Sequence, residues 1–437
     1  MARHRVNTGS RFLTHAGTPG TEGPLQPASV STHALHGATL SDMQRIRDVL
    51  GRALHPALAV LTAFLLGAIV IVLSDFEHLR QIGTDPLAAI GGALAGVFDG
   101  YSAMFAGALG DPDRIAVAIR SGSAKDIAAA LRPMSETLVS ATPFIFAGLG
   151  LAVSFHAGLF NLGVDGQFLI GGLGASITAT LVAGYLPPLL ALAVAVFGGT
   201  VAGGAYGFVP GFLKARTGAH EVITTLMLNG LAPGLAFLIV GAIHLSGPAR
   251  AISAVPRVID LPTIRVDYGF IVAIAMAAVV SRLLFRTTRG FELRATGFNR
   301  TAARGAGIRP GRTTMLAMSL SGGLVGMGSA FFGLGPALGS PGVPEASMGY
   351  TAVALALLAG RRPSGVVGAA LLYGALTTGA QNMVIGTGIP LALLTVIAAF
   401  AIMFVAAPDL TRAIWRLRSP KATADSGANT PGPAAST

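Results

Sequence analysis

The stretch FHAGLFNLGVDGQFLIGGLGAS, residues 155–176, is apolar enough to lie in a membrane, yet it carries three polar side chains within a few residues of one another. These are Asn161, Asp165 and Gln167. A lipid bilayer penalises such groups unless protein buries them or they face water. The stretch therefore predicts a site where the chain departs from a plain membrane helix.

The composition indicates a polytopic membrane protein. Of the 437 residues, 52% are hydrophobic and 11% are charged, whereas roughly 25% are charged in soluble proteins. Apolar runs close to the about 20 residues that a helix needs to cross a bilayer recur through most of the chain. The net charge is +11. No basic stretch is interleaved with aromatic residues, so we do not expect nucleic-acid binding.

The two ends of the chain differ from its middle. Residues 1–40 and 420–437 lack an apolar period, so we expect a disordered N-terminal arm and a disordered C-terminal tail. Residues 41–52 place Met43, Ile46 and Val49 at helical spacing beside arginines, which suits a short amphipathic helix on the membrane surface. A helical extension of the first span is the alternative. We assign residues 53–410 to a transmembrane domain.

Ten membrane spans are predicted from length and hydropathy. The connection at 76–134 is expected to lie outside the cytoplasm or to be partly inserted, because its apolar part, 87–109, contains several glycines and Asp99. The spans themselves cover residues 56–75, 136–155, 158–183, 186–210, 221–245, 267–286, 313–335, 348–360, 364–383 and 388–407.

Basic loops set the expected orientation. Lys214 and Arg216 follow the fourth span, Arg361 and Arg362 follow the eighth, and further basic residues follow the tenth. Counted alternately, these groups share a side with the N-terminal arm, and the positive-inside rule makes that side the cytoplasm. Both termini are therefore expected to be cytoplasmic.

Small residues recur at helical spacing within the spans. Gly199, Gly203 and Gly207 are four residues apart, as are Gly322 and Gly326. Such ridges let helices approach closely in lipid, where hydrophobicity does not itself drive association. They predict a tightly packed bundle, but they do not indicate a substrate.

In this frame, the polar groups of 155–176 lie near the cytoplasmic end of the third span. Glycines loosen the helix there, so freed backbone groups need partners. We interpret the stretch as a structural turn and latch, against two alternatives, a plain helix end and direct contact with a transported solute. The residues of the predicted latch are Asn161, Gly163, Asp165, Gly166 and Gln167.

The segment 282–314 is the most informative polar part of the chain, with eight arginines and one glutamate. Asn299 can cap a short helix over 300–306, which Gly307 would stop. In that helix Ala302, Ala303 and Ala306 form a ridge of small residues, with Arg300 and Arg304 on a neighbouring face. Two interpretations are open: a basic loop that only fixes topology, or a helix that docks in a groove of another protein.

Motifs for enzymatic chemistry are missing from the sequence. It contains no GxxxxGK[ST] phosphate loop, no HExxH zinc motif, no GxSxG elbow and no cysteine. We therefore expect no enzyme activity, no bound metal and no cofactor held by this chain.

An ion-coupled secondary carrier is an alternative class. Such carriers usually need ionisable groups deep in the bundle, and Asp165 is the one carboxylate well inside a predicted span. Glu136, Glu221 and Asp267 lie at predicted span ends, where capping is the simpler explanation. A membrane scaffold without transport is a third possibility.

Four stretches in this order and at these spacings resemble the permease subunits of ATP-binding-cassette (ABC) importers, in the branch that serves nucleosides and simple sugars and is related to the ribose and branched-chain amino-acid permeases. They are LVSATPFIFAGLGLAVSFHAGLFNLGVDGQFLIGG (138–172), GAHEVITTLMLNGLA (218–232), ELRATGFNRTAARGAGI (292–308) and MGYTAVALALLAGRRPSG (348–365).

The resemblance implies an all-α, type II ABC importer-like bundle of about ten helices in a bacterial inner membrane. It implies three partners: an ABC ATPase that uses the ATP, a second permease chain and an extracytoplasmic solute-binding protein. The loop 287–312 becomes a cytoplasmic coupling loop, and the second stretch supplies the candidate pathway residues Glu221, Thr224 and Asn229. The coupling residues implied are Glu292, Arg294, Asn299, Arg300, Ala302, Ala303, Arg304, Ala306 and Gly307.

This chain departs from the family pattern in places. Asp165 stands where the family often has Glu, and Arg300 and Thr301 follow Asn299 where Pro and an acidic residue are common. Gly305 replaces a common Tyr. The ATPase-docking chemistry is therefore expected to be adapted to a particular partner. The NLGVDGQ motif favours nucleosides as the solute class.

Overall fold

The structure is a computed structural model that describes residues 58–75, 80, 83–182, 184–243, 268–334, 348–387, 389 and 391–416. All of them belong to the larger of two compact units, His55–Thr437. No strand occurs in these ranges, so the all-α prediction is confirmed there. The predicted arm at 1–40, the surface helix at 41–52 and the tail at 420–437 lie outside the described residues.

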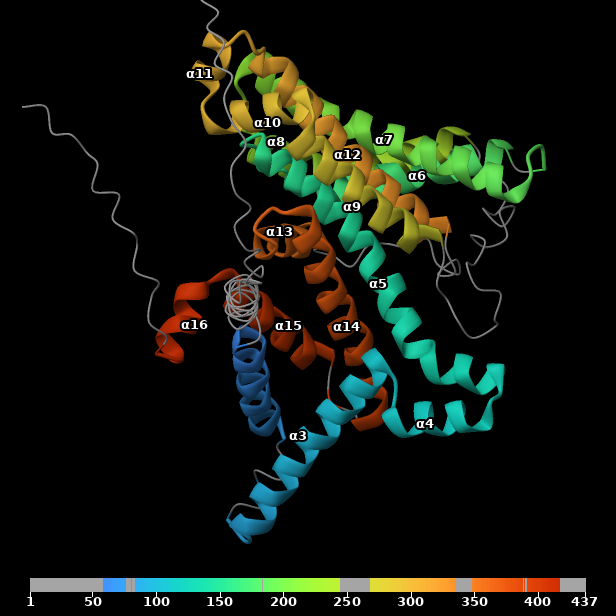
Figure 1. Cartoon of the computed structure of the whole chain (residues 1–437), viewed down its shortest axis with the longest axis vertical. Coiled ribbons are helices and arrows are strands. Elements are labelled where there is room, and N and C mark those ends of the chain that lie inside the picture. Colours follow the sequence, from blue (N-terminus) through green and yellow to red (C-terminus); the bar gives the residue numbers. More distant parts are fainter. Residues whose placement is uncertain are drawn as a thin grey trace, which may run out of the picture. The chain divides into compact units, whose positions relative to one another are not determined.

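The chain forms a succession of helices (Figure 1). A helix over Leu58–Ser74, blue and unlabelled in Figure 1, comes first among the described residues. It is followed by α3 (Pro86–Leu109), α4 (Pro112–Ser121), α5 (Ala124–His156), α6 (Val164–Val182), α7 (Pro188–Thr217), α8 (Glu221–Ile243), α9 (Tyr268–Arg286), α10 (Thr288–Phe298), α11 (Arg300–Gly305), α12 (Pro310–Leu334), α13 (Met348–Leu358), α14 (Pro363–Thr387), α15 (Leu391–Ala406) and α16 (Pro408–Ile414).

Six helices are long and apolar enough to cross a membrane, namely α3, α5, α7, α8, α9 and α12. Each of the ten predicted spans falls on a helix. Five fall on members of this set, and the other five fall on Leu58–Ser74, α6, α13, α14 and α15. The helix positions agree with the sequence prediction, apart from α6, which begins at Val164 rather than near residue 158.

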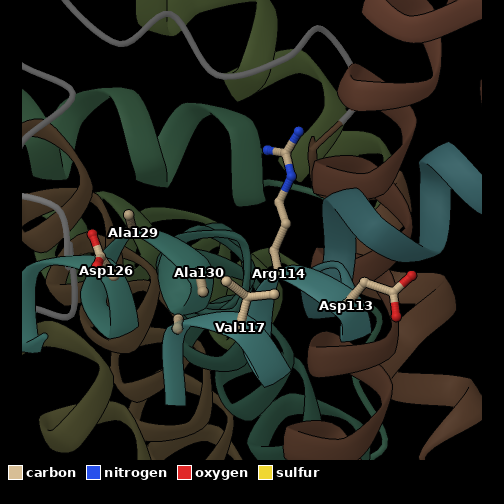
Figure 2. A pocket seen from close by; sticks show the side chains of 7 residues that line it. Asp113, Arg114, Val117, Asp126, Ala129 and Ala130 are labelled. Carbon is tan, nitrogen blue, oxygen red and sulfur yellow. The ribbon is translucent and has the colours of Figure 1, made fainter. Parts of the chain in front are cut away.

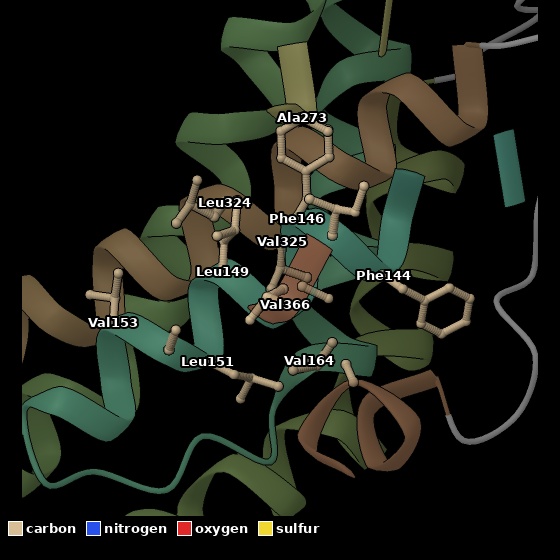
Figure 3. Packing of buried hydrophobic residues seen from close by; sticks show 14 of the residues in the cluster. Phe144, Phe146, Leu149, Leu151, Val153, Val164, Ala273, Leu324, Val325 and Val366 are labelled. Atoms are coloured by element: carbon tan, nitrogen blue, oxygen red, sulfur yellow. The ribbon is translucent and has the colours of Figure 1, made fainter. Parts of the chain in front are cut away.

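Helix α5 is the centre of the main core. In its most apolar window, 83% of the residues are buried, because α9, α12, α13 and α14 all pack against it. Phe146 stacks on Phe331 of α12 with ring centroids 5.8 Å apart. Figure 3 shows Phe146 and Leu149 of α5 among residues of the same cluster, including Val325 and Val366. Burial of these side chains holds α5 in place, and the end of α5 in turn positions the segment that follows it in the sequence.

Helices α6, α7 and α12 approach one another closely at their glycines, where backbone packs on backbone. A Cβ added at Gly203 of α7 would lie 2.5 Å from the Gly322 oxygen and 2.8 Å from the Gly326 Cα, both on α12. A Cβ at Gly199 would lie 2.9 Å from the Gly171 oxygen of α6. The glycine ridges seen in the sequence are therefore the surfaces where these helices meet.

The predicted connection at 76–134 is mostly helical. α3 is a single 24-residue apolar helix, tied to its neighbours by a hydrogen bond from Tyr101 Oη to the Phe64 oxygen (2.6 Å) and by one from Thr137 Oγ1 to the Ala108 oxygen (2.8 Å). The sequence prediction that residues 76–134 lie outside the cytoplasm or are partly inserted concerns the membrane and stays a prediction.

Helix α4 folds back on the first turns of α5. Gly122, with φ of +65°, ends α4, and Ser123 caps α5 by accepting from the Asp126 N–H. A shallow groove lies between the two helices, with Asp113 and Arg114 from α4 on its edge and Ala130 from α5 in its lining (Figure 2). This hairpin lies about 50 Å from the other end of α5, by the helical rise of 1.5 Å per residue.

The glycine packing yields a stability prediction. Gly203→Ala should destabilise the protein by about 1–3 kcal/mol, because the added methyl group meets backbone atoms that cannot move aside locally. Gly230→Ala on α8 is the matched control, since a Cβ there meets nothing within 4 Å. Thermal unfolding in mild detergent measures both. Equal midpoints for the two variants would contradict the described packing of α7 on α12.

Candidate functional site

The chain leaves the helical path between α5 and α6. Residues 157–163 are not helical, and Gly158 has φ of +70°, in the left-handed region that favours glycine. A Cβ at Gly158 would lie 3.0 Å from the Cα of Gly297 in α10. The turn is therefore tight, and it packs directly against the predicted coupling loop.

An amide pair holds this turn from inside. Asn161 and Gln167 are buried, at 0% and 1% exposure. Asn161 Nδ2 donates to Gln167 Oε1 (2.9 Å), and Gln167 Nε2 donates to Asn161 Oδ1 (3.1 Å). Asn161 Oδ1 also accepts from the Gly163 N–H (2.9 Å), and its Nδ2 donates to Ser321 Oγ of α12 (2.8 Å). Both polar atoms of Asn161 are thus bound by protein.

Helix α8 supplies the remaining partners of the turn. Asn229 Nδ2 donates to the Leu162 oxygen (2.7 Å), while its Oδ1 accepts from the Gly166 N–H (2.9 Å). Thr225 Oγ1 accepts from the Leu162 N–H (3.3 Å). Side chains of α8 therefore bind the backbone groups that would otherwise be left without partners in an apolar environment.

Asp165 connects the same region to α13. Its Oδ1 accepts from the N–H of Gly349 (2.7 Å), the second residue of α13. The first N–H groups of a helix have no partner within the helix, and the helix dipole favours negative charge there. The carboxylate therefore acts as a cap supplied by another helix. No basic side chain forms an ion pair with it in the part of the chain that is described.

The three predicted pathway residues do not form one polar surface. Glu221 is buried at 7% exposure and forms an ion pair with Lys214 at the end of α7. Thr224 Oγ1 donates to the Glu221 oxygen of its own helix (3.1 Å). The Asn229 side chain forms hydrogen bonds with the turn before α6, as described above. Of the three, Thr224 alone lines a cleft.

That cleft lies between α7 and α8 and is apolar. It has a volume of about 520 Å³. Thr224 is the polar side chain among the residues that line it, which are Val209, Pro210, Leu213, Thr224, Met227, Leu228, Gly230 and Leu231. Such a lining offers few hydrogen bonds to a polar solute. The cleft suits an apolar neighbour better than a nucleoside or a sugar.

The short helix predicted over 300–306 is present as α11. Asn299 is its N-cap, and its Oδ1 accepts from the N–H groups of Thr301 (2.9 Å) and Ala302 (3.0 Å). The helix ends at Gly305, with Ala306 as its C-cap, and Gly307 follows with φ of +82°. The predicted coupling loop also contains α10, which the sequence did not predict.

The structure divides the predicted coupling residues into two groups. Ala303 is buried at 4% exposure, whereas Ala302 and Ala306 are exposed. Arg300 donates from Nη2 to Thr314 Oγ1 of α12 (3.0 Å). Ala303 and Arg300 therefore attach α11 to this chain, and the role of both residues in coupling to an ATPase stays a prediction. Ala302 and Ala306 form the small-residue face that is left free.

Two further coupling residues belong to α10. Glu292 Oε2 accepts from Arg289 Nη1 (3.0 Å) on the same helix. The Arg294 guanidinium lies over the Phe285 ring, 5.5 Å from its centroid. The Arg294–Phe285 contact links α10 to α9, whereas the Glu292–Arg289 pair lies within α10. Among the described residues, no group of three or more His, Cys, Asp or Glu side chains could hold a metal ion.

Comparison with known proteins decides the class. Residues 134–407 match the family model described as branched-chain amino acid transport system / permease component. The chain belongs to this permease family. It is a pore-forming subunit type rather than the ATPase, and the relatives give no support to an ion-coupled carrier.

Curated relatives cover most of the permease. It is 33% identical to the guanosine ABC transporter permease protein NupP of Bacillus subtilis (strain 168), over 82% of this chain and 94% of NupP. It is 31% identical to the nucleoside ABC transporter permease protein NupB of Lactococcus lactis subsp. cremoris, over 81% of this chain and 91% of NupB. The glucose ABC transporter permease protein TsgB13 of Haloferax volcanii is 30% identical, over 62% of this chain and 75% of TsgB13. No solved structure matches the permease.

Sequence reasoning missed the long-range partners of the turn. Thr225, Ser321 and Gly349 lie 63, 160 and 184 residues from the groups that they bind. Each is an unremarkable residue in an apolar helix, so nothing in the local pattern of the permease indicates its role. Asn229 was predicted as a pathway residue, and only the fold shows that its side chain binds the turn before α6.

The turn before α6 yields a prediction for the permease. Asn161→Ala should destabilise it, because the Gly163 N–H, Gln167 and Ser321 lose their buried partner, and each stranded group costs about 1–3 kcal/mol. Ser176→Ala is the control, since Ser176 Oγ only bonds back to Gly172 of its own helix. Thermal unfolding in detergent measures both. An Asn161→Ala protein that unfolds like the control but binds solute less well would favour the solute-contact alternative.

Proposed function

We propose that this permease is one of two permease subunits in an ABC importer that carries nucleosides inward, driven by ATP hydrolysis in a separate ATPase subunit. The main support is that two relatives, described as guanosine and nucleoside permeases, align with this chain over more than nine tenths of their own length. A simple sugar is the second substrate class, supported by the match to a glucose permease over a shorter part of the chain.

The proposed setting is a bacterial inner membrane, with ten spans and both termini in the cytoplasm. In this placement the turn at 157–163, α10 and α11 lie at the cytoplasmic side. The α4–α5 hairpin lies at the opposite end of α5 and faces the solute-binding protein. In this placement α3 does not cross the membrane, because a full crossing by this helix would move the N-terminus to the outer side.

Translocation is proposed to run between the two permease chains rather than through this one. The cleft between α7 and α8 supports this view, since its lining is almost wholly apolar. α8 is the most exposed of the six apolar helices, with 11% of its window buried. It is therefore free to contact a second permease chain or the solute path.

Uptake by the reconstituted importer tests the function. Proteoliposomes that contain this permease, a second permease, the ATPase and the binding protein should accumulate labelled guanosine only when ATP is supplied. Excess unlabelled adenosine or uridine should compete, while glucose should not. Guanosine uptake by this chain alone and without ATP would contradict the proposal, and competition by glucose alone would favour the sugar alternative.

The same assay tests the free face of α11. Ala302→Trp should weaken co-purification with the ATPase and slow ATP-driven uptake, because a helix seated in a groove tolerates little extra volume. Ser364→Trp, exposed at the start of α14, is the bulky control outside α10 and α11. If both variants bind the ATPase as well as the unaltered permease, α11 is not the coupling helix.

A further inference from the structure

Four arginines surround a groove where the end of α7 meets the start of α12. The groove has a volume of about 370 Å³, and Arg216, Arg304, Arg309 and Arg312 contribute to its lining. α7 and α12 come together here, since a Cβ at Gly311 would lie 3.6 Å from the Ala215 Cβ. No acidic residue lines the groove, so four positive charges converge without a negative one.

These charges have no ion-pair partner within the described part of the chain. The salt bridges found there involve other arginines, namely Arg114, Arg132 and Arg289. All four groove arginines are exposed. Their mutual repulsion is relieved when an anion occupies the concavity, and guanidinium groups match phosphate oxygens in a bidentate manner. The chemistry of the groove therefore favours a phosphate-bearing ligand.

An apolar strip continues from the groove along α7. Arg216 lies over the Phe212 ring, 5.6 Å from its centroid, and Phe212 contacts Phe208 one turn earlier with ring centroids 5.8 Å apart. Both rings are exposed, at 41% and 42%. The basic groove therefore lies at the ends of two candidate membrane helices, and exposed aromatic rings follow it along one of them. This order matches a phospholipid in a bilayer, whose charged headgroup is followed by its acyl chains.

We propose that this groove binds the phosphate headgroup of an anionic phospholipid of the cytoplasmic leaflet, with an acyl chain lying along Phe212 and Phe208. The inference rests on the proposed membrane placement, in which the ends of α7 and α12 are cytoplasmic. A basic loop that only sets topology needs neither a concave shape nor an adjoining aromatic strip. The ATPase is the competing occupant, because Arg304 of α11 lines the groove, but Ala302 and Ala306, which form the free alanine face of α11, do not.

Lipid retention by the full-length chain tests this site. The protein is purified in mild detergent, supplied with phosphatidylglycerol or phosphatidylcholine, and analysed by native mass spectrometry. Arg309→Gln combined with Arg312→Gln should weaken phosphatidylglycerol binding about tenfold or more, since each arginine near a membrane surface contributes substantially to anionic lipid binding. Arg282→Gln combined with Arg286→Gln is the matched control, because it removes the same charge from exposed positions of α9 outside the groove.

The expected result is selective loss of phosphatidylglycerol in the groove variant, retention in the control, and no displacement of the lipid by millimolar inorganic phosphate. Equal retention in both variants, or equal binding of phosphatidylcholine, would overturn the proposal. Displacement by inorganic phosphate would identify a free-anion site, and loss of the ATPase with lipid retained would assign the groove to that partner. Thermal unfolding in phosphatidylcholine checks that both variants are folded. Lipid binding is measured without transport, so its failure and a failure of nucleoside uptake are separate results.

Discussion

The buried amide pair of Asn161 and Gln167 is the interaction on which the arrangement of the site depends. An irregular backbone can exist at membrane depth only where protein satisfies its N–H and C=O groups. The pair binds the Gly163 N–H from within the turn, and Asn229 binds Leu162 and Gly166 from α8. These bonds hold the non-helical residues 157–163, which join the end of α5 to the start of α6 at Val164. The polar residues of a family-specific motif therefore have a structural explanation that needs no solute.

Contacts run continuously from the short helix α11 to the interior of the bundle. Arg300 and the buried Ala303 fix α11 against the rest of the chain, with Arg300 bonded to α12. α12 packs through its glycines on α7, which in turn meets α6 at the backbone level. If an ATPase displaced α11, the displacement would be transmitted to α12, α7 and α6, because close-packed helices contain few voids that could absorb it. Asp165 extends the connection from α6 to the start of α13.

The elements that the sequence predicted correctly are those governed by local patterns. Hydropathy and length located the helices, and Asn299 predicted the start of α11 through ordinary capping chemistry. The spacing of Gly199, Gly203 and Gly207 predicted close packing. What could not be predicted depends on segments distant in sequence: the partners Thr225 and Ser321, the cap from Asp165 to Gly349, and the inward orientation of Ala303. A six-residue helix has several similar faces, and only tertiary packing selects the buried one.

Hydrogen exchange at the backbone amides of residues 162–166 tests most directly whether this turn is a closed structural unit. In the full-length permease, the amides of Leu162, Gly163 and Gly166 should exchange as slowly as those in the core of α5, although residues 162 and 163 are not helical, because side chains bind all three. Exchange as fast as at an exposed loop would contradict the structural role of Asn161, Gln167 and Asn229. Such fast exchange would mean that the side chains of these three residues are available to contact a solute.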